Sequence, residues 1–254
     1  MFECKIPLFN PAPLRKEILE SMRDLALSEQ AARYGGYSDG ILAGCNLYEE
    51  NMMIGVTGGL IKYAGRVYVL AGKDSVPYRA TDSWTVLKIQ FGGEEVSRDF
   101  RAYRGHLTLD ENTNILPNEV ELGRFKLKTG SRLRTDYVDF ADMETEYDTV
   151  NPMNVPFAGI GEHTLSPVIL TFFAREAYPY ASDPLDIAFC TCCLANGGVM
   201  QRESIQSYIL RRQGLAGAAF SNRELHSHLA DILAEIKGVA RQMGEGQAEG
   251  ILLL

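Results

Sequence analysis

The sequence predicts an α+β protein, in which an antiparallel β-sandwich or barrel-like module is preceded by a helix and followed by a helical C-terminal region. Three observations predict it. Apolar residues recur at helical spacing near the start, short β-branched and aromatic runs follow between glycine turns, and helical spacing then returns. With 254 residues, 46% of them hydrophobic, the chain can bury a core without disulfides or metals. We expect three regions: residues 1–35, 36–135 and 136–254.

The first region combines an extended arm with an amphipathic helix. Prolines at positions 7, 11 and 13 disfavour regular helix before Leu14. From Pro13 to about Arg33, apolar residues recur at spacings typical of one helical face. That face consists of Leu14, Ile18, Met22 and Leu25. An apolar face on a terminal helix needs a cover, either its own domain's core or a partner helix in an oligomer. We expect these four residues to form an interface between copies.

The second region has the rhythm of antiparallel β-structure. Two short segments, 49–51 and 64–65, have the length of hairpin turns. Short strands separated by such turns favour a sandwich or barrel over a parallel sheet. The expected strands cover residues 41–48, with a glycine kink, 52–56, 60–63, 66–70, 84–91, 100–103, 105–109 and 119–128. The strand over 84–91 is expected to end at Gly92-Gly93.

The third region reads as four helices after an acidic stretch and a proline-marked connector. The first is expected to begin with Ser166 as its N-cap and Pro167 in its first turn, and to reach about Tyr178. The others are expected over 184–194, 201–212 and 222 to about 243. The last carries an apolar stripe of Leu225, Leu229, Ile232, Leu233 and Ile236.

Charge is distributed unevenly along the chain. Residues 136–254 hold 16 acidic and 7 basic side chains, which repel phosphate backbones, so we expect no nucleic-acid partner. A basic cluster precedes this region, and it is either a cross-strand-paired face or a surface for an anionic partner. It consists of Arg124, Lys126, Lys128, Arg132 and Arg134. No apolar run approaches the ~20 residues of a membrane span, and no secretory signal is expected at the start.

Candidate chemistry is sparse. Neither a phosphate-binding loop nor a nucleophile elbow occurs. One alternative is an enzyme or metal-dependent protein with a site assembled from His163 and the carboxylates of residues 136–148. Its members would include Asp136, Asp139 and Asp142 at spacing three, with Ser166 or the cysteines 190, 192 and 193 as imaginable partners. None of these has partners at workable spacing, so we expect no catalytic residue, cofactor or metal.

A second alternative is a DNA-binding regulator. The segment 195–198 separates two expected helices in a way that resembles a helix-turn-helix break. Only Arg202, Arg211 and Arg212 add positive charge there. Within an acidic half of the chain, helix packing is the better interpretation of this pair.

Two stretches resemble proteins of phage tails. Residues 37–47 and 53–70, with Gly40-Ile41-Leu42-Ala43-Gly44 and a later Gly-Arg-Val-Tyr, resemble a β-module that attaches fibres and arms to a baseplate. Residues 123–140 and 184–190 resemble an uncharacterised family encoded in tail-gene clusters of clostridial prophages and related contractile particles. The resemblance covers most of residues 1–215.

The resemblance has functional implications. It implies a structural or adaptor component without catalytic residues. Such a chain would be made in the bacterial cytoplasm and assembled into a phage tail or tail-like particle. Its partners would be other tail or baseplate proteins and further copies of itself.

Overall fold

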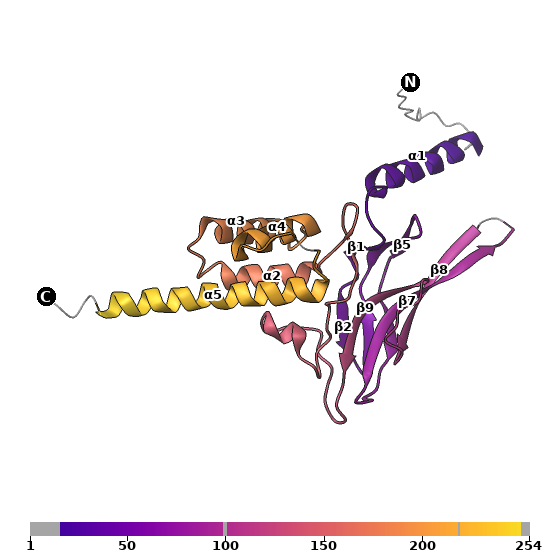
Figure 1. Ribbon diagram of the computed structural model, residues 1–254. Helices are drawn as coiled ribbons and strands as arrows, with labels where there is room; N and C mark the ends of the chain where they lie inside the picture. The colour runs from indigo at the N-terminus through magenta and orange to yellow at the C-terminus, as the bar shows by residue number, and fades with distance from the viewer. Residues whose placement is uncertain (1–15, 99–100, 218, 250–254) are drawn as a thin grey trace, which may run out of the picture. The chain divides into compact units, whose positions relative to one another are not determined.

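The computed structural model describes residues 16–98, 101–217 and 219–249, with side chains as far as residue 238 (Figure 1). The chain forms two compact units, Met1–Tyr37 and Ser38–Leu254. The first contains the helix α1, and the second contains all the other described helices and strands. This composition confirms the α+β class.

The helix α1 spans Lys16–Tyr34 and buries none of its residues. Glu17 lies in its first turn and Arg33 in its last, which suits the helix dipole. Two ion pairs at i,i+4 spacing, Lys16–Glu20 and Arg33–Glu29, lie along its surface. The described part of the helix matches the expectation, whereas Leu14 and the three prolines lie outside the described residues.

The β-rich part contains three sheets. Their strand orders are β11-β10-β1-β4-β5, β2-β3-β6 and β8-β7-β9. Residues from all three sheets share one apolar core, and none of the sheets closes into a barrel. The strands are β1 (Gly40–Gly44), β2 (Leu47–Glu50), β3 (Met53–Val56), β4 (Gly59–Tyr63), β5 (Arg66–Leu70), β6 (Asp74–Pro77), β7 (Trp84–Val96), β8 (Arg101–Asp110), β9 (Glu119–Lys126), β10 (Phe157–Ala158) and β11 (His163–Thr164).

Both expected hairpins form, but the first turns at a different place. Asn51 and Met52, and not residues 49–51, connect β2 to β3 with φ of 54° and 60°, whereas Ala64 and Gly65 connect β4 to β5 as expected, with φ of 48° and 72°. Positive φ at both central residues is the geometry that matches the twist of a two-residue hairpin. The turns therefore fix the register of both hairpins.

The strand expected over 41–48 is divided in two. Gly44 (φ 66°) and Cys45 (φ 56°) turn the chain, so that β1 and β2 enter different sheets. A side chain at Gly44 would collide with the carbonyl oxygen of Gly58 in the neighbouring segment. A glycine is thus required at this crossing.

Three other strand expectations need correction. β7 does not end at Gly92-Gly93 but continues to Val96 through a β-bulge between Phe91 and Glu94. The strands expected over 100–103 and 105–109 form one strand, β8, which pairs along β7. β6 and the short β10 and β11 were not predicted, and β10 pairs with β1 in parallel. Glycines were interpreted as strand ends where the ladder absorbs them as a bulge.

Four helices follow, close to the expected positions: α2 (Pro167–Ala177), α3 (Pro184–Ala195), α4 (Arg202–Gln213) and α5 (Asn222–Glu249). Pro167 and Pro184 occupy first helical turns, and Asp183 caps α3 by accepting a hydrogen bond from Leu185 N at 2.7 Å. Ser166 stands at the N-cap of α2, but its hydroxyl makes no capping hydrogen bond. α5 runs beyond the expected end near residue 243, and Figure 1 shows it alongside α2.

The helices enclose a second core. The whole predicted stripe of α5 is buried in it, together with residues of α2, α3 and α4. Phe173 lies at its centre, and Phe189 and Tyr208 stack with ring centroids 3.8 Å apart. The chain between the β-rich part and the first helix, α2, adds β10 to a sheet, where Phe157 pairs with Ile41 of β1. A domain boundary at residue 135 stays a prediction.

Candidate functional site

The predicted chemical residues are held in separate places. His163, in β11, has its Nδ1 3.3 Å from the Ser38 hydroxyl, which also accepts a hydrogen bond from Gly159 N. The Arg202 side chain donates to the backbone oxygen of His163. These contacts tie β11 to its surroundings, and no contact joins His163 to a carboxylate of residues 136–148 within the described parts of the chain.

The carboxylates of Asp139 and Asp142 accept hydrogen bonds within the fold. Asp142 accepts hydrogen bonds from Arg134 Nη2 at 2.7 Å and from Val138 N at 2.9 Å. Burial alone would raise the pKa of Asp142, but these hydrogen bonds and the Arg134 charge bring the pKa below its usual value. Asp139 accepts a hydrogen bond from Asp142 N. In the described residues, no group of three or more His, Cys, Asp or Glu side chains could hold a metal ion.

The basic cluster is paired with carboxylates, two of them from residues 136–148. Four of its members form ion pairs: Arg124 with Glu121, Lys126 with Glu146, Arg132 with Glu49 and Arg134 with Asp142. Lys128 lies over the Tyr147 ring, 4.3 Å from its centroid. The cluster is therefore an internally paired face.

Two of the three clustered cysteines are buried thiols. Cys190 and Cys193 are buried in the helical core, and burial raises the pKa of each to about 12. Cys192 is exposed on the same helix. A thiol with so high a pKa stays protonated at neutral pH and is a poor nucleophile.

The helix pair α3–α4 has few cations available for a DNA groove. Arg202 donates to Asn222 Oδ1 at 2.6 Å and to the Phe220 carbonyl. Arg212 contacts the buried carboxylate of Asp186 at 3.1 Å and Glu235 at 3.1 Å. Two of the three arginines that DNA binding would use are thus engaged in packing the helices together.

The apolar face of α1 remains a candidate interface. Its described members are all exposed: Ile18 by 37%, Met22 by 57% and Leu25 by 67%. The predicted role of these residues, with Leu14, stays a prediction. Leu19 and Leu27 are also exposed, on other sides of the helix.

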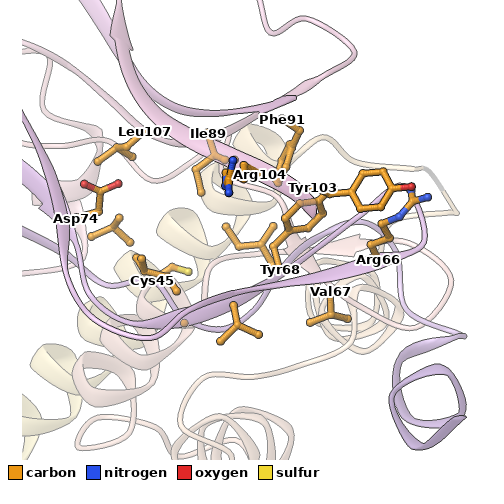
Figure 2. A pocket seen from close by; sticks show the side chains of 16 residues that line it. Cys45, Arg66, Val67, Tyr68, Asp74, Ile89, Phe91, Tyr103, Arg104 and Leu107 are labelled. Carbon is orange, nitrogen blue, oxygen red and sulfur yellow. The ribbon is translucent and has the colours of Figure 1, made fainter. Parts of the chain in front are cut away.

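A groove that the sequence analysis missed lies in the β-rich part. It is a cavity of about 420 Å³ between β5 and the β7–β8 ladder. Its apolar lining includes Val56, Ile61, Tyr68, Ile89, Phe91 and Leu107. Figure 2 shows Ile89, Phe91 and Leu107 facing Tyr68 and Cys45 across it. The alternating apolar residues of the strands were visible in the sequence, but which of them line an open cavity depends on how the sheets meet.

The groove has a polar residue at each end. Arg66 and Tyr103 lie at one end, with the guanidinium carbon 3.9 Å from the ring centroid, and Asp74 lies at the other (Figure 2). Phe91, which lines the groove, has its ring centroid 4.1 Å from that of Tyr63, on which it stacks, and 4.6 Å from that of Tyr68. Burial raises the pKa of Cys45 to about 11. Arg104 also lines the cavity, between its two ends (Figure 2), so the lining combines apolar side chains with three charged ones.

Comparisons with known proteins give two structural likenesses. No protein-family model matches the sequence, and no curated protein matches it. The crystal structure of TssK is similar over 93% of this chain and 69% of that chain, with a TM-score of 0.39 and 9% identity. The type VI secretion system TssK-TssF-TssG baseplate subcomplex is similar over 91% of this chain and 100% of that chain, with a TM-score of 0.33 and 9% identity.

At these values neither likeness carries an argument about this chain. The second structure is of a secretion-system baseplate assembly, and that description applies to that protein. In the parts of this chain that the structure describes, no helix has the length and apolar character needed to cross a membrane.

Proposed function

We propose that this chain is a structural adaptor of a phage-like contractile tail or baseplate. In this role it is made in the bacterial cytoplasm and assembled into a tail or tail-like particle. There it contacts other tail or baseplate proteins and further copies of itself, and it attaches fibres or arms to the particle. The stretches 37–47, 53–70, 123–140 and 184–190 carry the sequence resemblance on which the assignment to a particle is based.

The observation that supports an assembly role most is the state of α1. Its 19 residues include an apolar face, yet none of them is buried. Burial of a side chain the size of Ile, Leu or Met contributes roughly 1.5–3 kcal/mol. Burial of Ile18, Met22 and Leu25 against another protein would therefore stabilise that contact.

The state of the predicted chemical residues supports the same role. Lys126 and Arg134 of the basic cluster pair with Glu146 and Asp142 of the acidic stretch, and Arg212 of the helix pair pairs with Asp186. The proposed role involves no chemical reaction and depends on surfaces that contact other proteins.

Localisation in the particle tests the proposal. Tail-like particles from a strain that encodes the chain are purified, labelled with a specific antibody and examined by negative-stain microscopy. The matched control is a strain lacking the gene. We expect antibody label at one end of the particles from the encoding strain and no label on particles from the control strain. Absence of the chain from every assembled particle would refute the proposal.

A further inference from the structure

The groove between β5 and the β7–β8 ladder is a place where the apolar core of the β-rich part stays open. Tyr68, Ile89 and Leu107 pack against that core, yet each of them remains partly exposed. All three line the cavity of about 420 Å³ (Figure 2). Cavities that bind small ligands have this size and are lined mainly by apolar and aromatic side chains. The cavity can therefore accommodate the apolar body of a small ligand.

One end of the groove presents a cation without a paired anion. The Tyr103 ring holds the Arg66 guanidinium in place, and in the described parts of the chain no carboxylate forms an ion pair with Arg66. A guanidinium stacked on a ring keeps its N–H edge available for a carboxylate. Burial raises the pKa of the neighbouring Tyr68 above its usual value, although the Arg66 charge opposes this shift, so the hydroxyl is protonated and can donate. This end of the groove is therefore suited to an anionic group.

The other charges of the lining restrict where an anion can lie. Arg104, between the two ends, forms an ion pair with Glu95, so its charge is already balanced. Asp74 lies at the end opposite Arg66 (Figure 2), where it would repel an anion and, being exposed, stays hydrated. Charge therefore favours one orientation, in which the anionic end of a ligand lies at Arg66 and its apolar end points toward Asp74.

We propose that this groove binds a linear amphipathic carboxylate of the medium-chain fatty acid class. Its carboxylate accepts hydrogen bonds from Arg66, and its apolar chain lies along Tyr68, Ile89 and Leu107. The lining part of β5, from Arg66 to Leu70, spans roughly 13 Å, which is comparable to the extended chain of decanoate. The inference does not depend on the proposed function, because the groove lies within the β-rich part of a single chain.

Isothermal titration calorimetry on the full-length chain tests the inference. Decanoate is the probe, at neutral pH and below the concentration at which it forms micelles. Decyltrimethylammonium is the matched control, since it has the same apolar chain and the opposite charge. We expect saturable one-to-one binding of decanoate, and binding of the control at least about tenfold weaker because Arg66 repels it. No saturable binding of decanoate, or equal affinities for the two probes, would overturn the inference.

Two matched variants test the contact with the carboxylate. Arg66→Gln removes the cation of the groove, while Arg79→Gln removes an exposed cation that does not line it. We expect Arg66→Gln to weaken decanoate binding about tenfold, the effect of lost hydrogen bonds to a charged group, and Arg79→Gln to change it less than about twofold. Circular dichroism should show an unchanged fold in both variants, since both side chains are exposed. Equal affinities of the two variants would refute a carboxylate at Arg66.

Photolabelling of the unmodified chain tests the place and the orientation independently of any variant. A decanoate that carries a diazirine at the end remote from its carboxylate is irradiated with the chain, and the labelled peptides are identified by mass spectrometry. We expect label on residues 69–74, and excess decanoate should abolish it. Label at Arg66 or Tyr103, or on peptides outside the groove, would contradict the inference.

Discussion

The helices α1 and α5 carry the same sequence pattern, an apolar stripe, but they differ in how much of that stripe is buried. Each has one apolar stripe, but α1 buries none of its residues, whereas Leu225, Leu229 and Ile232 of α5 are fully buried. The partners of α5 come from α2 and α4 of the same chain. An apolar stripe thus predicts the need for a cover: α5 finds it within its own unit, whereas the described residues of the unit that holds α1 provide none.

The largest expected effect concerns the buried stripe. Leu229→Asp places an unpaired carboxylate at a position with no solvent exposure, which should cost more than about 4 kcal/mol and unfold the chain. The matched change on α1, Leu25→Asp, should leave the circular dichroism spectrum unchanged, because this side chain is exposed within the single chain. A folded Leu229→Asp variant would break the comparison, because it would show that the helical core tolerates a charge.

A buried lysine in the β-rich part can be compared with an exposed lysine on α1. Lys88 is 1% exposed and lies 3.2 Å from both Asp110 and Glu119, of which Glu119 is buried. Lys88→Met leaves that carboxylate without its cation, and we expect a loss of about 3–5 kcal/mol in urea unfolding. Lys16→Met on α1 removes an exposed i,i+4 partner and should cost less than about 0.5 kcal/mol. The double variant Lys88→Met/Glu119→Leu should recover much of the loss, and a failure to recover would show that packing dominates.

A smaller, pH-dependent effect arises at His226 of α5. The ring is buried, stacks on Phe140 at 4.3 Å and has its Nδ1 3.4 Å from Glu144. Burial lowers the pKa of His226 below its usual 6.5, although the Glu144 charge opposes the shift. The unfolded chain then binds a proton that the folded chain resists, so stability present above pH 6.5 is lost as the pH falls.

Urea unfolding at pH 7.5 and 5.5 measures this effect. The parent should lose about 1 kcal/mol more than His226→Phe, which keeps the stacked ring. Glu144→Gln should enlarge the loss, since it removes the charge that favours the protonated ring. Equal losses in the parent and His226→Phe would show that His226 does not control the acid side of the stability profile.

Most elements could be predicted because their signals are local. The two-residue spacing of Ala64-Gly65 between strands and the prolines at 167 and 184 act within a few residues of the chain. The hairpin and the helices begin where these residues predict. Gly92-Gly93 was misinterpreted because a bulge and a strand end use the same residue, and only the pairing along β8 distinguishes them.

The groove could not be predicted for a different reason. Phe91, Leu107 and Tyr68 have ordinary strand patterns, and their common cavity exists because two sheet edges remain apart. The pairing of Arg134 with Asp142 was open at the sequence level, where a paired face and an anionic partner surface were both possible. Short-range spacing cannot show which charges a fold brings together.

Size-exclusion chromatography with light scattering on Ile18→Asp tests the central claim, that α1 contacts another subunit. Leu27→Asp is the matched control, since the two positions are nine residues apart and so lie on opposite sides of the helix. The account predicts that Ile18→Asp gives a folded monomer by circular dichroism, while Leu27→Asp assembles like the parent. An unfolded Ile18→Asp chain, or one that assembles like the parent, would contradict it.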